Sequence, residues 1–214
     1  MTVALKTVVI EKEVAIKPPN IQTEEFILEG TTPYMQHRFW KKAELIRGHQ
    51  QGKQGGKRPK KEPRDFRQEW QEATYKMADG SYGINVSAFR QGLISACRLA
   101  NFKMTVAKLS IFVLHDGFDE RDGTLLVRLD GDPRPFTTEN IQWVKNDDGS
   151  VDLRARPIWD IWSVKLRIRY DADQFALMDV TNLLQRLGEQ VGLGEGRPDS
   201  KYSAGLGYGL FAMK

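Results

Sequence analysis

The chain has 214 residues, of which 40% are hydrophobic, 10% aromatic and 28% charged, so it can bury a core as a single domain and is not disordered throughout. Its one cysteine, Cys97, cannot form an internal disulfide, and no apolar run is long enough to span a membrane. Because residues 1–15 also lack the apolar core of a signal peptide, we expect a cytoplasmic protein.

The N-terminal part of the chain predicts two strands. Residues 3–16 alternate apolar and polar side chains, and Pro18 and Pro19 end that pattern. A second apolar run at residues 26–28 ends at Gly30 and a Thr-Thr-Pro turn. The pattern leaves open whether the first strand extends the second or forms an edge of the sheet.

Residues 38–67, called here the basic segment, carry eleven basic residues against three acidic ones, a net charge of +8. The whole chain has a net charge of +4, so the remaining residues carry −4. Residues 50–63 contain no apolar side chain and cannot bury a face of their own, whereas helices are expected on either side, at about residues 39–47 and 66–77. An acidic body with one strongly basic element favours a polyanion as partner.

The middle of the chain predicts one helix and several strands. Asn85 is a good N-cap, and apolar residues follow it on one helical face as far as residue 100. Buried strands are expected at residues 109–114 and 125–129. Residues 141–144 and 151–154 flank an Asn-Asp-Asp-Gly-Ser turn and predict a hairpin. Residues 164–170 alternate cleanly between apolar and basic side chains and predict a further strand.

A second helix is predicted at residues 177–191, where apolar residues recur at spacings of three and four, with Asp171 or Asp173 as its cap. A glycine-rich stretch at residues 192–209 and a last strand at residues 210–213 follow. Without the basic segment, the order of elements is β-α-β-β-α-β. This order predicts an α+β fold of the ferredoxin-like split type, with two helices on one face of an antiparallel sheet and a basic insertion at about residues 37–78.

The basic segment is the leading candidate for a binding site. Lysine and arginine at this density neutralise phosphates, and neighbouring aromatic residues can stack on bases. The alternative is a solvated surface loop that binds nothing. The predicted nucleic-acid contacts, two of them from the glycine-rich stretch, are Arg38, Phe39, Trp40, Lys41, Lys42, Lys53, Lys57, Arg58, Lys60, Lys61, Arg64, Arg197 and Lys201.

The glycine-rich stretch follows a helix and lacks a Lys-Ser/Thr ending, so it is neither a dinucleotide-binding motif nor a P-loop. Its glycines have two interpretations. They let backbone N–H groups form an anion nest, with Arg197 and Lys201 supplying charge, or they end the helix and form a tight turn. The pattern does not separate these interpretations.

The histidines His37, His49 and His115 have no metal-ligand spacing with one another or with the cysteine, so neither a metal nor a cofactor is predicted. A lone histidine can transfer protons, which makes a metal-independent endoribonuclease using His37 or His49 the alternative function.

Two further clusters have structural interpretations. The acidic residues at positions 116–122 lack calcium-loop spacing and are interpreted as a solvated turn. Of Trp159 and Trp162, one is expected in the core, and the other is either a stacking surface or further packing.

The order of elements, residues 82–93 (YGINVSAFRQGL) and the late glycine loop resemble the RAMP superfamily of CRISPR-associated RNA-binding proteins, especially its Cas7-like backbone subunits. The chain is also similar to a family of uncharacterised bacteriophage proteins. That likeness rests on Thr32-Pro33 with His37-Arg38, on residues 95–98 (SACR), and on residues 192–198 with 205–211. The resemblance implies a ferredoxin-like core that binds single-stranded nucleic acid and assembles along it, in the host cytoplasm if phage-encoded.

The sequence therefore predicts a non-catalytic protein that binds single-stranded RNA or DNA through its phosphate backbone and forms a homo-oligomer or filament. A second alternative is a phage interaction or assembly protein that acts on a host complex. No aspartate equivalent to the cleaving residue of some Cas7-like proteins is found, so target cleavage is not expected.

Overall fold

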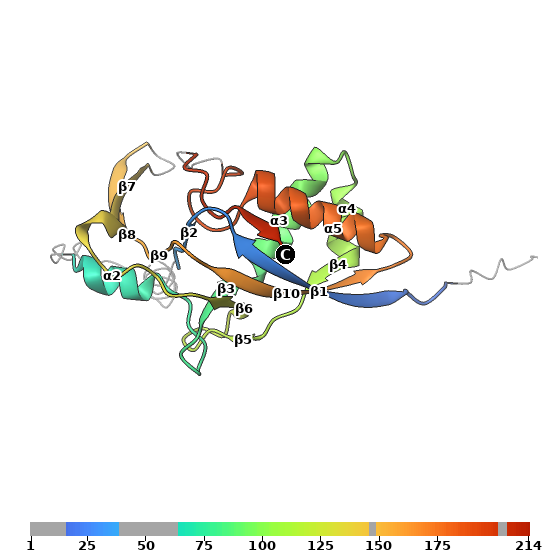
Figure 1. Ribbon diagram of the computed structural model, residues 1–214, viewed down its shortest axis with the longest axis horizontal. Coiled ribbons are helices and arrows are strands. Elements are labelled where there is room, and N and C mark those ends of the chain that lie inside the picture. Colours follow the sequence, from blue (N-terminus) through green and yellow to red (C-terminus); the bar gives the residue numbers. More distant parts are fainter. Residues whose placement is uncertain (1–15, 39–63, 146–148, 201–204) are drawn as a thin grey trace, which may run out of the picture.

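The computed structural model describes residues 16–38, 64–145, 149–200 and 205–214. Within this part of the chain the fold is α+β, with four α-helices and a mostly antiparallel sheet. The helices α3, α4 and α5 lie on one side of the sheet, whereas α2 lies at the far end of the molecule (Figure 1). The strand predicted at residues 3–16 and the helix predicted at about residues 39–47 fall outside the described residues.

The main sheet has seven strands in the described part of the chain, and each of their pairings is antiparallel. They are β1 (Ile21–Gly30), β3 (Tyr82–Asn85), β4 (Ile111–Val113), β5 (Gly117–Phe118), β6 (Leu125–Asp130), β10 (Ser163–Asp171) and β11 (Phe211–Met213). β10 pairs with β1 along its length, and β11 continues the sheet beyond β1. The other edge of β10 is shared by β4 and β6, and β6 pairs in turn with β3 and β5.

Two small sheets and several helices complete the described fold. The small sheets pair β2 (Tyr34–Met35) with β9 (Ile158–Trp159), and β7 (Ile141–Lys145) with β8 (Val151–Ala155). The helices are α2 (Phe66–Glu72), α3 (Val86–Leu99), α4 (Met104–Ser110) and α5 (Leu177–Arg186), with short helical turns η1 (Thr138–Asn140) and η2 (Leu187–Val191).

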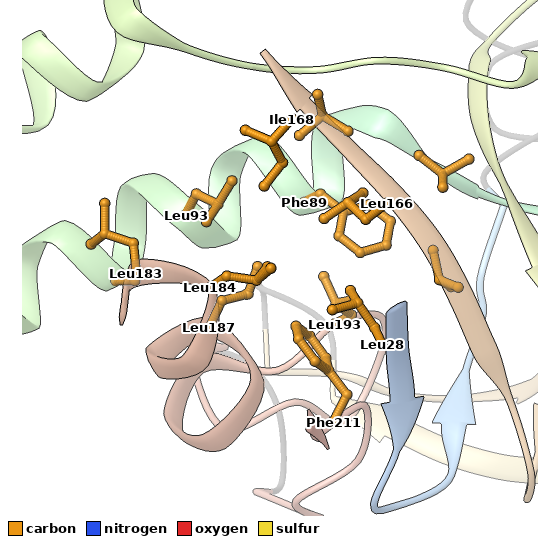
Figure 2. Packing of buried hydrophobic residues seen from close by; sticks show 14 of the residues in the cluster. Leu28, Phe89, Leu93, Leu166, Ile168, Leu183, Leu184, Leu187, Leu193 and Phe211 are labelled. Atoms are coloured by element: carbon orange, nitrogen blue, oxygen red, sulfur yellow. The ribbon is translucent and has the colours of Figure 1, made fainter. Parts of the chain in front are cut away.

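The main core lies between the helices and the inner face of β10, as Figure 2 shows. Leu166 and Ile168 of β10 are fully buried, as the predicted alternation of this strand requires, and they face Phe89 and Leu93 of α3. Leu184 and its neighbours on α5 and η2 close the core from the other side. Apolar residues at a period of two on the strand and of three to four on the helices thus meet in one layer.

Three predicted elements are confirmed in detail. α3 begins directly after Asn85, whose side chain accepts a hydrogen bond from the Ser87 backbone N–H at 2.8 Å. The predicted hairpin is formed by β7 and β8, and the predicted second helix is formed by α5 together with η2. Cys97 is fully buried, in keeping with its position on the apolar face of α3.

Several boundaries were predicted wrongly. α2 ends at Glu72 rather than at about residue 77, and β1 begins at Ile21 rather than at residue 26.

Two further differences concern β4 and α5. The strand expected from residue 109 begins only at Ile111, because Leu109 belongs to α4 and is 79% exposed. A short apolar run does not distinguish a strand from the end of a helix. The cap of α5 is neither Asp171 nor Asp173, since the N-cap is Ala176, whose N–H donates to the Asp179 side chain at 2.9 Å.

Trp159 and Trp162 are both core residues, so neither offers a stacking surface. The Trp162 indole N–H donates to the Thr32 carbonyl at 2.8 Å, and both indole rings pack against Tyr34. In the described part of the chain, no helix has the length and apolarity that crossing a bilayer requires.

Candidate functional site

A polar cleft of about 280 Å³ opens between α3 and the glycine-rich stretch. Its lining comes from four parts of the chain. These are β2 with the two residues after it, Tyr75 in the loop between α2 and β3, the β3–α3 junction with the first turns of α3, and residues 191–199. The cleft is therefore a product of the tertiary fold.

The α3 wall of the cleft consists of small and polar residues. Ala88, Gln91 and Ser95 line the cleft at spacings of three and four, which places them on one side of the helix. Asn85 and Ser87 add an amide and a hydroxyl at the helix start. This wall carries no charged side chain and offers hydrogen-bond donors and acceptors.

The opposite wall is the glycine-rich stretch, which backbone hydrogen bonds attach to the body. The Glu195 N–H donates to the Met35 carbonyl at 2.8 Å, and the Leu193 N–H donates to the Gly209 carbonyl at 3.0 Å. Gly194 has φ +71°, and a side chain there would overlap the Met35 carbonyl oxygen. Positive φ and close backbone approach explain this glycine.

The backbone hydrogen bonds of the glycine-rich stretch test whether its glycines form an anion nest. The N–H groups of Gly192, Leu193 and Glu195 all donate to carbonyls of the protein. They are therefore not directed at a bound anion, which favours the interpretation as a helix end followed by a turn. Arg197, predicted as a phosphate contact, is partly buried and donates to the Gly194 carbonyl at 2.8 Å. Lys201 lies outside the described residues.

The floor of the cleft is fixed by Gln36, which is 2% exposed. Its amide nitrogen donates to the Gly83 carbonyl at 2.8 Å, and its amide oxygen accepts from the Tyr75 N–H at 2.8 Å. This one side chain connects the residues after β2 to β3 and to the loop before it, so the floor is held rigidly.

The two carboxylates of the cleft are paired with arginines, whereas Arg197, which also lines the cleft, donates to a backbone carbonyl and forms no ion pair among the described residues. Glu195 forms an ion pair with the buried Arg156 at 3.3 Å, and Asp199 pairs with Arg98 at 3.3 Å. Apart from Arg197, the cleft therefore presents neutral groups and paired carboxylates, an arrangement that suits a neutral polar group.

His37 lines the cleft immediately before the basic segment begins. Burial lowers its pKa from 6.5 to about 3, and the nearby charges of Arg156 and Arg154 act in the same direction. The imidazole is therefore neutral at pH 7 and has no proton to donate as an imidazolium acid. His49, the other histidine of the ribonuclease alternative, lies outside the described residues.

The low pKa of His37 makes stability depend on pH. In the unfolded chain His37 binds a proton below about pH 6.5, whereas in the folded protein it remains neutral down to about pH 3. The unfolded state therefore binds more protons between these values, and stability falls as the pH falls through this range. Between about pH 8 and about pH 5 we expect His37 to remove about 2 kcal/mol from the free energy of unfolding.

Urea unfolding of the wild type and of His37→Gln at both pH values measures this effect. The variant should lose about 2 kcal/mol less than the wild type on acidification. His115→Gln changes an exposed histidine and serves as the control, with the wild-type loss expected. Equal losses in the wild type and in His37→Gln would contradict the assigned protonation state.

Arg38 was predicted to contact phosphates, and the structure instead buries it inside the protein at 4% exposure. Its guanidinium pairs with Asp119, which is 3% exposed, and with Asp122 at 3.0 Å. Asp119 also accepts from the Lys76 N–H at 3.3 Å. Arg38 is thus a structural anchor that holds the start of the basic segment to the loop at residues 119–122.

Of the acidic residues interpreted as a solvated turn, Asp116, Glu120 and Asp122 are exposed as expected, and the interpretation is wrong only for the buried Asp119. Burial raises the pKa of Asp119, and the positive charge of Arg38 opposes this shift. Burial also acts to raise the pKa of Asp122, but hydrogen bonds with Thr124 and Asp119 and the charge of Arg38 together outweigh it, and the pKa falls to about 2. Among the described residues, no group of three or more His, Cys, Asp or Glu side chains could hold a metal ion.

Arg64, another predicted phosphate contact, is the second anchor of the basic segment. Its guanidinium contacts Glu69 of α2 at 2.7 Å and Asp152 of β8 at 2.6 Å. Arg38 at one end of the basic segment and Arg64 near the other end are thus ion-paired to the body. The other predicted contacts of this segment lie outside the described residues: Phe39, Trp40, Lys41, Lys42, Lys53, Lys57, Arg58, Lys60 and Lys61.

Sequence reasoning had marked His37, residues 82–93 and the glycine-rich stretch separately, but nothing in the sequence showed that they form one cleft. Gln36 and Tyr75 carry no motif and were missed. The small and polar residues of α3 did leave a signal, because they occupy the helix side opposite the apolar positions that were used to predict it.

In comparisons with known proteins, the chain matches no protein-family model, and no curated protein matches it.

Proposed function

We propose that this protein binds single-stranded nucleic acid without catalysing a reaction on it, with the basic segment contacting phosphates and the polar cleft receiving a base. The observation that carries this proposal is the separation of charge. A segment of net charge +8 stands against a body of net charge −4, and Arg38 and Arg64 anchor the segment by ion pairs. Clustered lysines and arginines of this kind release counterions from a phosphate backbone.

The cleft supports the same proposal because of its chemistry and its place. It offers amide and hydroxyl groups that match the neutral donors and acceptors on the edge of a base. His37 lines it and Arg38 follows directly, so the basic segment starts at the cleft. A strand held by its phosphates along the segment can therefore present a base to the cleft.

We also infer a ferredoxin-like split arrangement for the core. The support comes from the order β11-β1-β10, in which the first and last strands of the core are neighbours. It also comes from the shared edge of β10, where β4 and β6 together take the place of one strand. Helices on one side of the sheet agree with this arrangement (Figure 1). The likeness to Cas7-like RAMP proteins, and the assembly along a strand that it implies, remain part of the proposal.

The proposal is tested by the salt dependence of oligonucleotide binding. Changing Lys57, Arg58, Lys60 and Lys61 together to glutamine removes four cations of the basic segment. If each neutralises one phosphate of a single strand, the slope of log affinity against log salt should fall by roughly 2 to 3. Fluorescence anisotropy of a labelled oligonucleotide between low and moderate salt measures this slope.

A matched control changes four cations that already have a carboxylate partner. Arg128, Arg134, Lys165 and Lys214 are each paired with an aspartate or glutamate at 2.5–2.9 Å. Their joint change to glutamine removes the same formal charge and should alter the slope far less. If the wild-type protein binds no oligonucleotide, the proposed function is wrong. If both variants change the slope equally, the basic segment is not the part of the protein that contacts the phosphates.

A further inference from the structure

Two arginines from different elements meet at one aromatic ring on the outer side of the sheet. Phe112 lies between the core residues Ile111 and Val113 of β4, so its side chain points away from the core. Arg169 of β10 is its partner in register, with its guanidinium carbon 5.0 Å from the ring centroid. The guanidinium carbon of Arg90 on α3 lies 5.8 Å from the same centroid.

These two guanidinium groups are held in place without being neutralised. Arg90 donates to the Lys108 carbonyl at 2.7 Å, and its Nε is buried without a hydrogen-bond partner among the described residues. Within that part of the chain, neither Arg90 nor Arg169 forms an ion pair. The neighbouring outward cations of β10 differ, because Lys165 pairs with Glu25 at 2.9 Å and Arg167 with Asp116 at 2.8 Å.

We propose that Arg90 and Arg169, oriented by Phe112, form a phosphate clamp for the backbone of a bound single strand. This inference rests on the proposed nucleic-acid binding and adds a second contact region to it. The guanidinium group offers several N–H donors in a fixed plane that suit phosphate oxygens, and contact with an aromatic face limits the freedom of the side chain. Lys108, exposed beside Arg90, adds a third positive charge.

The clamp is separate from the polar cleft. On α3, the cleft is lined by Ala88, Gln91 and Ser95, whereas Arg90 is directed toward α4 and β4. A strand that occupies both regions must therefore contact α3 on two sides, and loss of the clamp should leave the contacts of the basic segment intact.

The test compares two double variants of the full chain by anisotropy of a labelled oligonucleotide at several salt concentrations. Arg90→Gln with Arg169→Gln removes the clamp, and Lys165→Gln with Lys214→Gln removes two ion-paired cations. The clamp variant should flatten the salt slope by about 1 to 1.5, while the control should leave it nearly unchanged. Arg169→Gln alone should flatten it by about 0.7, and serves if the double variant does not fold.

Phe112→Leu separates orientation from charge. It keeps both guanidinium groups and should therefore keep the wild-type slope, but it should weaken binding about two- to fivefold because the arginines lose their aromatic support. If the wild type binds and the clamp variant behaves like its control, the clamp is wrong and the proposed function stands. If the wild type binds no oligonucleotide at any salt concentration, both fail.

Discussion

Replacing Arg38 with alanine is expected to lower the free energy of unfolding by about 3–5 kcal/mol. Arg38 and Asp119 are 4% and 3% exposed, and Arg38 also pairs with Asp122 at 3.0 Å. Removing the guanidinium leaves Asp119 buried without its positive partner and Asp122 beside it. An uncompensated buried charge costs more than the pair itself contributes. Urea unfolding at neutral pH measures the loss.

Arg128→Ala is the matched control for this experiment. Arg128 pairs with Asp79 at 2.7 Å, but both side chains are about half exposed. Solvent screening makes such a pair contribute little to stability, so its loss should cost far less. Asp119→Asn in the Arg38→Ala background removes the stranded charge while it keeps an acceptor for the Lys76 N–H, and should recover part of the loss. If Arg38→Ala and Arg128→Ala cost the same, Arg38 is not the anchor described above.

Gly209→Ala is expected to destabilise the protein by about 3 kcal/mol, from backbone strain and steric overlap together. Gly209 has φ +74°, and a Cβ atom there would overlap the Leu193 carbonyl. Its N–H donates to the Pro33 carbonyl at 2.7 Å, and its carbonyl accepts from the Leu193 N–H at 3.0 Å. The substitution therefore forces the turn at residue 209 away from Leu193, which lines the polar cleft.

Gly207→Ala separates the two causes. Gly207 has φ +69°, but a Cβ atom there meets nothing within 4 Å. This variant should therefore carry only the backbone strain of about 1 kcal/mol. Thermal unfolding of both variants measures the difference between their stabilities, and this difference reports the steric overlap alone. Equal melting temperatures of the two variants would mean that the backbone around residue 209 adjusts to the added Cβ atom without loss of stability. The contact between Gly209 and Leu193 would then not hold the cleft wall in place.

The sequence predicted the parts of this protein whose stability depends on a regular pattern. β10 and α3 carry apolar residues at periods of two and of three to four, and both were recognised almost to their ends. The predicted nucleic-acid contacts were recognised less well than these elements. Three of its thirteen residues, Arg38, Arg64 and Arg197, are described by the structure, and each contacts the protein itself. The composition of a segment shows how many charges it carries, but it does not show which residue each charged side chain pairs with in the folded protein.

The sequence by itself determined an α+β protein with a concentrated positive segment, because periodicity, turn residues and charge counts are local properties that a linear pattern carries. Only the tertiary structure decided which cations are neutralised. Arg38 meets Asp119 across 81 residues, and Arg64 meets Asp152 across 88. The polar cleft likewise joins residues from four separate segments. Such pairings follow from the packing of strands and helices around a shared core, so they become visible only when the chain is folded.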